Sequence, residues 1–265
     1  DQRVARALNA PFDLPWTEID TGRREAFRDF VDGLPADPRS LSVLHIALPH
    51  VMWRYSPDGT TYPDFRPAAD TLLINPSTNG ETKRNVQQMM LQLQFTDREL
   101  GKLIRKMKDE GTWDESLFIV TADHGAAFER SGSRRILDSR NQGWIMPVPH
   151  FIKYPGQQRG QVVRGTADGR DIAPTVMNAL GLEPLEDMSG IDLTGRDSLP
   201  ARKATDIVDT IGGRTEVELA PVERERRRAS RFFDRVLGQS FYAPGGHADL
   251  LGSPPRELTA SRLGR

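Results

Sequence analysis

The chain has 265 residues, of which 37% are hydrophobic and 28% charged, and this composition excludes a collagen, a coiled coil and a wholly disordered chain. The 36 Lys and Arg residues nearly balance the 37 Asp and Glu residues, so a formal net charge of −1 gives no electrostatic reason to expect nucleic acid as a partner. Cysteine is absent, which excludes disulfides, thiolate metal sites and a cysteine nucleophile. The sequence contains no run of eighteen apolar residues, so it predicts no membrane span.

The first forty residues are polar and interrupted by prolines, and we interpret residues 1–40 as an N-terminal flank. The next segment, 41–48 (LSVLHIAL), is a short apolar run that ends at Pro49, which predicts a buried strand. Because the sequence begins at Asp1 without an initiator methionine, we expect it to be part of a longer protein.

A long amphipathic helix is predicted over about residues 80–110. Thr78 and Glu81 have the spacing of a capping box, and Gly111 lies where a helix stop is expected. Apolar residues recur with the 3.6-residue period, and we expect the helix to pack on a sheet through Met89, Met90, Leu93, Leu100, Ile104 and Met107. On this interpretation Leu93→Asp unfolds the domain.

Two further apolar runs, 117–121 and 149–154, predict buried strands, and 171–180 predicts a short helix. Pro174 lies in the first turn of this helix and Gly181 follows its end. Helices that alternate with short apolar strands are typical of an α/β fold, so we expect a mostly parallel sheet with helices on both faces, built from 41–48, 117–121 and 149–154.

The composition changes after about residue 197, so we expect a domain over 41–197 and a polar C-terminal extension over 198–265. Residues 221–237 predict one helix with an apolar edge and a cluster of five arginines, namely Arg224, Arg226, Arg227, Arg228 and Arg231. Such a cluster either binds phosphate groups or an anionic surface, or forms a solvated helix face, and the interleaved acidic residues favour the solvated face.

The tripeptide Asp123-His124-Gly125 follows a predicted strand directly. A carboxylate and an imidazole can both face one ion if the backbone turns there, and a glycine permits such a turn. This donor pair suits zinc, manganese or another borderline cation. The alternative interpretation is a chance tripeptide or a capping aspartate, since two ligands do not complete a metal site.

His50 follows the predicted strand 41–48 and stands close to Trp53, Arg54 and Tyr55. A histidine in such surroundings can donate to an anionic oxygen or protonate a leaving group, and the alternative is a packed loop histidine. Because ligands bind outside the carboxyl ends of parallel strands, we expect His50, Asp123 and His124 to converge at one edge of the sheet. No glycine-rich phosphate loop, GxSxG elbow or HExxH motif is present, so no nucleophile is evident.

Five segments follow one another in a fixed order over about residues 41–196: LHIALPHVMWRYSPDGTTY, SLFIVTADHG, MPVPHFIKYPGQ, GRDIAPTVMNALGLE and GIDLTG. Together they resemble the sulfatase family of the alkaline-phosphatase-like superfamily, in particular the C-terminal part of bacterial membrane-anchored sulfatase-like proteins. The resemblance implies an alkaline-phosphatase-like fold that is incomplete in this chain.

The resemblance also implies a hydrolase of sulfate or phosphate esters that uses one divalent metal ion, whether Ca, Mn or Zn. Asp123 and His124 correspond to metal ligands, His50 to a contact with the substrate oxyanion or the leaving oxygen, and Arg140 to a basic residue at the substrate. The implied partner is an anionic ester substrate such as a glycan or an envelope polymer, and the implied location is extracytoplasmic, on a membrane anchor.

The family's nucleophile motif, C/S-x-P-x-R, does not occur here, and neither do its first acidic metal ligands. We therefore expect the nucleophile and the remaining ligands upstream, in a missing N-terminal half, and we expect this chain alone to be inactive. Two other functions stay open: a phosphotransferase of the same superfamily acting on envelope polymers, and a non-catalytic sulfatase-like domain that binds an anionic glycan or a partner protein.

Overall fold

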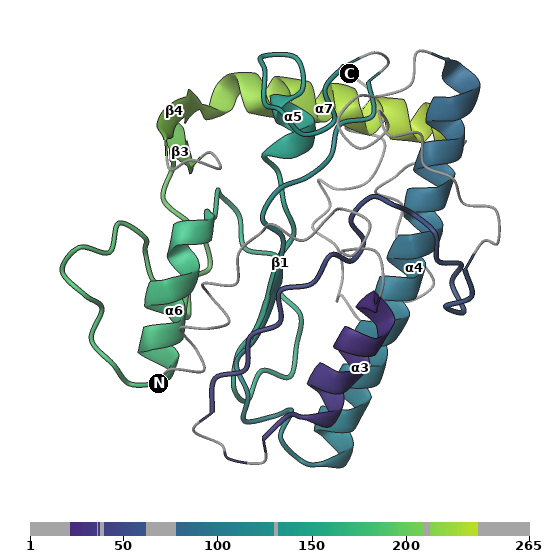
Figure 1. Cartoon of the computed structure of the whole chain (residues 1–265). Coiled ribbons are helices and arrows are strands. Elements are labelled where there is room, and N and C mark those ends of the chain that lie inside the picture. The colour runs from purple at the N-terminus through teal and green to yellow at the C-terminus, as the bar shows by residue number, and fades with distance from the viewer. Residues whose placement is uncertain are drawn as a thin grey trace. The chain divides into compact units, whose positions relative to one another are not determined.

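A computed structural model gives the structure of the chain and describes residues 22–35, 37, 40–61, 78–129, 132–208 and 213–237. Two compact units divide the chain, the first formed by Asp1–Leu72 and Arg84–Thr112 and the second by Leu73–Lys83 and Trp113–Arg265. All the described strands belong to the second unit, and β1, β3 and β4 are labelled in Figure 1. The boundaries predicted at residues 40 and 197 remain a prediction about the domains of the protein.

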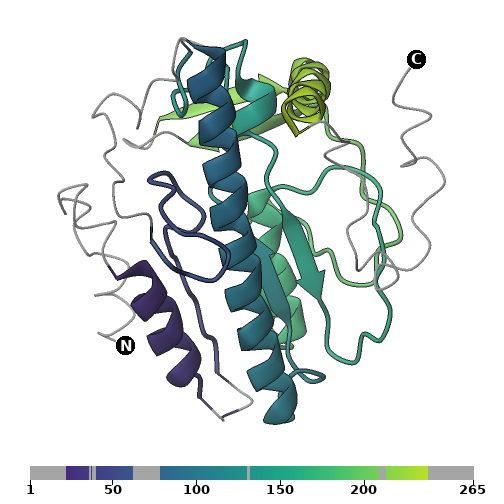
Figure 2. The same ribbon diagram turned by 90° about the vertical axis from the view of Figure 1, so that its right-hand side faces the viewer.

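The first unit consists of helix α3 (Arg23–Asp32), most of helix α4 (Asn79–Asp109) and the chain segment 40–61, which lies between the two helices in Figure 2. Its apolar core is formed by Leu48, Tyr55 and Phe95. The rings of Tyr55 and Phe95 stack with their centroids 4.9 Å apart. The core therefore joins the segment 40–61 to α4 through aromatic packing.

The predicted long helix is confirmed, together with both of its end signals. At the start of α4, Thr78 Oγ1 accepts from the Glu81 backbone N–H at 3.3 Å and donates to Glu81 Oε2 at 2.6 Å. At its end, Gly111 adopts a positive φ of 74° and the Thr112 N–H donates to the Met107 carbonyl at 2.9 Å. These contacts satisfy backbone groups that a helix end otherwise leaves without partners.

The buried side of α4 differs from the predicted one. Its buried residues between 84 and 109 are Val86, Gln92, Phe95, Glu99 and Leu103. Leu93 is 37% exposed, so its predicted burial is wrong, and with it the physical reason for expecting Leu93→Asp to unfold the domain. Apolar residues surround much of this helix, and only the contacts with other segments determine which of them are buried.

Strand β1 (Phe118–Thr121) and strand β2 (His150–Lys153) lie within the predicted runs, but they pair antiparallel, with Ile119 opposite Ile152 (Figure 2). Residues 41–48 form no strand, and Val43 is 75% exposed. The prediction of a mostly parallel sheet built from these three segments is therefore wrong. An apolar run predicts burial, but it contains no information about the direction of the neighbouring strand.

The second unit continues with helix α5 (Gln142–Ile145), the short 3-10 helix η2 (Gly169–Asp171) and helix α6 (Ile172–Ala179). The predicted helix over 171–180 is confirmed by α6, with Pro174 in its first turn and Gly181 at a φ of 69° after its end. Among the described helices, none combines the length and the apolar character needed to cross a bilayer.

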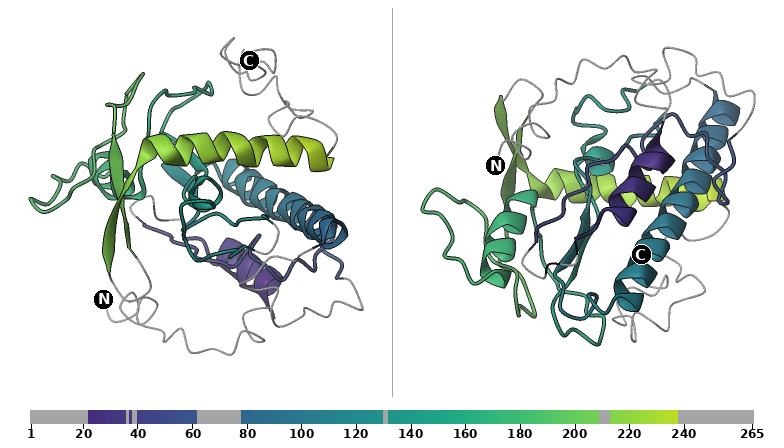
Figure 3. Two further views of the ribbon diagram at one scale, coloured as in Figure 1. Left: turned by 90° about the horizontal axis from the view of Figure 1, so that it is seen from above. Right: turned by 60° about the horizontal axis from the view of Figure 1, so that its bottom comes forward.

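A hairpin that the sequence did not predict follows α6. It consists of β3 (Ala204–Val208) and β4 (Arg214–Glu218), and helix α7 (Leu219–Leu237) continues directly from β4, as Figure 3 shows. Most residues of the two strands are exposed, so they lack the apolar alternation that identifies a strand. The predicted arginine-rich helix is confirmed by α7.

Helix α7 packs tightly on α5. The Trp144 ring lies 5.2 Å from the ring of Phe232 and 5.4 Å from the ring of Phe233. A Cβ atom on Gly143 would lie 2.1 Å from the backbone nitrogen of Arg226, so only glycine allows this close approach. The helix is therefore an integral part of the second unit.

Candidate functional site

The loop after β1 brings one carboxylate oxygen and one imidazole nitrogen together. The His124 backbone N–H donates to Asp123 Oδ1 at 2.8 Å, and His124 Nδ1 contacts the Gly125 carbonyl oxygen at 2.7 Å. Because a carbonyl only accepts, Nδ1 carries the hydrogen and the lone pair of the neutral ring lies on Nε2. Asp123 Oδ2 lies 3.5 Å from that Nε2.

These two atoms fit a shared divalent ion. Two ligands that each lie about 2.0–2.2 Å from a tetrahedral ion are separated by about 3.3–3.6 Å, which matches the observed distance. His124 Nε2 is buried and makes no hydrogen bond, and a backbone contact at the other ring nitrogen is usual for a metal-binding histidine. Within the described part of the chain, no group of three or more His, Cys, Asp or Glu side chains is arranged to hold a metal ion.

Gly125 has a different role from the predicted one. It is not among the glycines with a positive φ, so no left-handed turn requires it. Instead, a Cβ atom at this position would lie 2.2 Å from the carbonyl oxygen of Trp144, and the Gly125 N–H donates to the Ile145 carbonyl at 2.6 Å. The glycine therefore lets the loop that carries Asp123 and His124 lie against α5.

His50 is held firmly by its backbone. Its carbonyl oxygen accepts from Gln92 Nε2 at 2.7 Å and from Arg23 Nη1 at 3.0 Å, and its own Nδ1 contacts the Val51 carbonyl at 2.5 Å. His50 belongs to the first unit, whereas Asp123 and His124 belong to the second. The predicted convergence of these three residues, and the contact of His50 with a substrate, therefore stay predictions.

The sequence did not identify the two side chains that hold the His50 loop. Gln92 has no exposed surface, and its Oε1 also accepts from the backbone N–H groups of Arg54 and Tyr55 at 3.0 and 3.4 Å. Arg23 is 4% exposed and also donates to the Val51 carbonyl. A glutamine surrounded by apolar residues on a helix is the signal that could have identified Gln92.

Arg140, the predicted basic residue at the substrate, is 75% exposed in its side chain and pairs with Asp138 at 2.9 Å. Its contact with a substrate stays a prediction, and such a contact competes with Asp138. Arg134, six residues before it, is only 2% exposed, and its guanidinium lies 5.3 Å from the centre of the Phe128 ring. Burial lowers the pKa of Arg134 to about 10.

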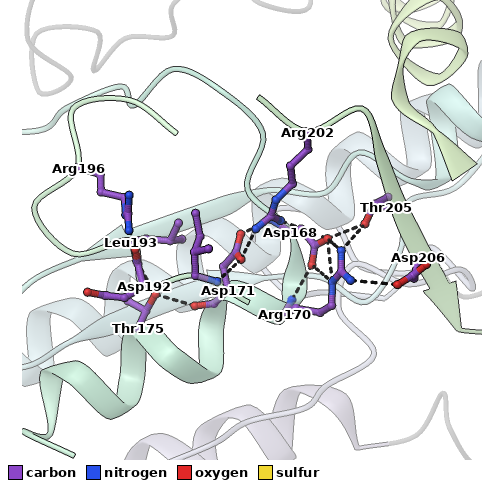
Figure 4. A network of polar contacts seen from close by, with 11 residues as sticks. Asp168, Arg170, Asp171, Thr175, Asp192, Leu193, Arg196, Arg202, Thr205 and Asp206 are labelled. Carbon is purple, nitrogen blue, oxygen red and sulfur yellow. Dashed lines mark hydrogen bonds and ion pairs between the residues drawn. The ribbon is translucent and has the colours of Figure 1, made fainter. Parts of the chain in front are cut away.

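A network of carboxylates and arginines surrounds the start of α6 in the second unit, as Figure 4 shows. Asp171 has no exposed surface, and its Oδ1 accepts from Arg202 Nη2 at 2.5 Å and from the Ile191 N–H at 2.8 Å. Its Oδ2 accepts from the Asp168 N–H at 2.9 Å. Both oxygens of Asp171 are therefore used within the protein.

Asp168 extends this network to the hairpin. Its Oδ2 accepts from Arg170 Nη2 and from Thr205 Oγ1, each at 2.6 Å, and lies 3.2 Å from Arg202 Nη1. Burial alone would raise the pKa of Asp168, but the hydrogen bonds from Arg170 and Thr205 outweigh it, so that the pKa lies well below the usual range. Because these carboxylates already have arginine partners, we interpret the network as structural.

Comparison with known proteins gives a family model and several relatives. The family model described as Sulfatase matches residues 10–182. An ulvan-active sulfatase of Formosa agariphila is 24% identical over 249 residues, which cover 86% of this chain and 47% of that protein. An endo-4-O-sulfatase of Bacteroides thetaiotaomicron is 29% identical over 135 residues, which cover 49% of this chain and 25% of that protein.

A lipoteichoic acid synthase-like protein of Bacillus subtilis, YvgJ, is 28% identical over 119 residues, which cover 41% of this chain and 19% of that protein. The chain spans about half the length of the ulvan-active sulfatase that it matches, and smaller shares of the other two.

Proposed function

Because the chain belongs to the sulfatase family, whose model matches residues 10–182, we propose that it forms part of a metal-dependent hydrolase of sulfate esters. The observation that supports this proposal most directly is the pair formed by Asp123 and His124. Its ligand atoms lie 3.5 Å apart, and the nitrogen of the pair is buried without a hydrogen bond.

In this proposal Asp123 Oδ2 and His124 Nε2 bind one divalent ion, Ca, Mn or Zn. Such an ion, when bound, neutralises charge on the ester and orients it. The Gly125 carbonyl keeps the hydrogen of His124 on Nδ1, so that Nε2 stays a ligand. His50 contacts the substrate oxyanion or the leaving oxygen, and Gln92 and Arg23 hold its backbone for that contact.

We further propose that the nucleophile and the remaining ligands come from sequence outside this chain, which also completes the alkaline-phosphatase-like sheet. The 47% coverage of the ulvan-active sulfatase supports this view, as does the lack of a C/S-x-P-x-R motif in the sequence. An extracytoplasmic location on a membrane anchor belongs to the same proposal and rests on the resemblance of the 44–62 segment alone.

The proposed substrate class is the sulfated glycans, since an ulvan-active sulfatase and an endo-4-O-sulfatase are among the relatives. A second candidate is phosphotransfer to an envelope polymer, which the similarity to a lipoteichoic acid synthase-like protein supports. The two chemistries use the same metal-assisted stabilisation of anionic oxygens and differ in the nucleophile.

Metal titration by calorimetry tests the Asp123–His124 site without an assay of turnover. We expect the 265-residue chain to bind Zn²⁺, Mn²⁺ or Ca²⁺ weakly, and Asp123→Ala and His124→Ala each to reduce that affinity at least about tenfold. Glu115→Ala, which removes an exposed acid of the same unit, is the matched control and should leave the affinity unchanged. Equal affinities in all four proteins contradict the site.

Hydrolysis assays then separate the candidate functions. Release of sulfate from an aryl sulfate by the full-length protein, with loss in Asp123→Ala, supports the sulfatase, whereas cleavage of a phosphodiester alone supports phosphotransfer. We expect no turnover by the 265-residue chain itself, because members of a catalytic site act as a unit. Turnover that Asp123→Ala abolishes in this chain would show that a nucleophile lies within it.

A further inference from the structure

Four arginines form one continuous row on helix α7: Arg224, Arg228, Arg231 and Arg235. Their spacing of four, three and four residues places them on the same side of the helix, and all four are exposed. With a rise of 1.5 Å per residue, the row is about 16 Å long and its members follow each other at about 4.5–6 Å along the helix axis. We call these four residues the arginine row.

The opposite side of α7 is fixed to the second unit. Val222 and Ala229 are buried on it, and Phe232 and Phe233 pack on Trp144. The row is therefore mounted on a rigid helix, so little ordering of the backbone is required when a ligand binds. Those four apolar side chains of α7 are covered by protein or pack on Trp144, unlike the exposed apolar face that an interfacial helix inserts into a bilayer.

The other arginines of the helix are engaged with its own acids. Arg226 and Arg227 pair with Glu223 at 2.8 and 3.4 Å, and within the row Arg228 pairs with Glu225 at 2.7 Å. Among the described residues, no ion pair is found for the remaining members of the row, Arg224, Arg231 and Arg235.

The C-terminal part of the row borders a surface hollow. Among the described residues, those that line the hollow are three arginines and one acid, namely Arg228, Arg231, Arg235 and Asp234, so positive charge prevails among them. The net charge of the whole chain is only −1, and this accumulation of cations is therefore a local property of α7. An anion at the hollow meets guanidinium groups that bind sulfate or carboxylate oxygens through two parallel N–H donors.

We propose that the arginine row binds a linear sulfated glycan, in addition to the proposed metal site. The class of ligand rests on the proposed function. A single exposed ion pair contributes little, but a chain with regularly repeated sulfate groups engages several arginines of one row at once. The row therefore selects a polymer over free sulfate and gives the protein a second point of attachment to its polymeric substrate.

Binding of fluorescently labelled dextran sulfate, measured by anisotropy in about 0.1 M salt, tests the proposal. The variant Arg224→Gln/Arg231→Gln/Arg235→Gln removes three members of the row and keeps good helix formers. The control, Arg84→Gln/Arg98→Gln/Arg105→Gln, removes three exposed arginines of α4 and causes the same change in charge. We expect the α7 variant to lose at least about tenfold in affinity and the control less than about twofold.

Equal losses in the two triple variants overturn the proposal, because binding then follows net charge. Unchanged binding by the α7 variant overturns it too, and so does preferential binding of the wild type to phosphatidylserine vesicles or equal binding to unsulfated dextran. Circular dichroism checks that the variants are folded. If the triple variant of α7 is not folded, the single variants Arg231→Gln and Arg235→Gln provide the same comparison.

The outcome is independent of catalysis. If the full-length protein releases no sulfate but the row still binds dextran sulfate, the proposed function fails and the binding surface stands. If sulfate release depends on Asp123 and the α7 variant binds dextran sulfate normally, only the inference about the row fails.

Discussion

The side-chain amide of Gln92 donates a 2.7 Å hydrogen bond to the backbone carbonyl of His50, forty-two residues away along the chain. Its oxygen accepts from the Arg54 N–H at 3.0 Å, so one buried side chain of α4 satisfies backbone groups on both sides of a loop turn. This contact makes the conformation of the His50 loop dependent on α4, and it can be tested by mutation.

Gln92→Leu keeps the approximate volume of the side chain but removes its hydrogen bonds. The buried groups that it leaves without partners should lower the free energy of unfolding by about 2–4 kcal/mol in urea titrations. Gln94→Leu, at an exposed position of the same helix, should change it by less than about 0.5 kcal/mol. Equal effects of the two substitutions contradict a specific role for Gln92.

Asp171→Ala removes a carboxylate with no exposed surface and leaves Arg202, whose side chain is 14% exposed, without one of its two partners. Breaking a buried pair in this way should lower the free energy of unfolding by about 3–5 kcal/mol. Asp187→Ala, at an exposed position in the same unit, serves as control and should have little effect. A loss of stability below about 1 kcal/mol for Asp171→Ala would show that the network is not structural.

Gly125→Ala should destabilise the second unit, because its Cβ atom would lie 2.2 Å from the Trp144 carbonyl oxygen and the backbone has to shift. We expect a loss of about 1–3 kcal/mol and weaker metal binding by Asp123 and His124, measured by thermal unfolding and calorimetry. Gly80→Ala is the matched control, since nothing lies within 4 Å of its added atom. That substitution should be neutral or stabilise the protein by up to about 1 kcal/mol.

The stability of the protein should fall in mild acid through His150. Burial lowers the pKa of His150, although the nearby carboxylates of Asp171 and Asp168 oppose this effect, and Nε2 is buried without a hydrogen bond. In the unfolded chain the imidazole of His150 takes up a proton near its ordinary pKa of about 6.5, whereas in the folded protein it is protonated only at lower pH. The contribution of His150 to the free energy of unfolding is therefore fully present above about pH 6.5 and decreases as the pH falls below that value.

His150→Gln removes this titration. The difference in urea midpoint between about pH 7.5 and about pH 5.5 should be smaller for the variant than for the wild type. His247→Gln, a histidine of the same sequence outside the described residues, provides a comparison for the general effect of losing one imidazole. An identical pH dependence of wild type and His150→Gln would contradict the interpretation.

Local signals were sufficient for the elements whose stabilising contacts are close in sequence. Thr78 and Glu81 lie three residues apart, and Gly111 follows α4 directly, so the ends of this helix could be predicted. The candidate metal pair could be predicted for the same reason, because Asp123 and His124 are adjacent in sequence and the carbonyl of the next residue, Gly125, orients the imidazole ring. Gln92 and Asp171 could not be identified, since their partners lie at distant positions in the chain.

The sequence by itself determined where α4, α6 and α7 form and that a carboxylate and an imidazole follow the apolar run of β1. It did not distinguish the runs that become β1 and β2 from the run at 41–48, which forms no strand. The tertiary structure alone decided that β1 and β2 are antiparallel, that Phe95 and not Leu93 is buried, and that α7 packs on α5. Helix ends and strand propensity depend on hydrogen bonds and side chains within a few residues. Strand direction and burial depend on contacts between segments that are far apart in the sequence. Long loops connect these segments, and no local residue pattern records which of them meet.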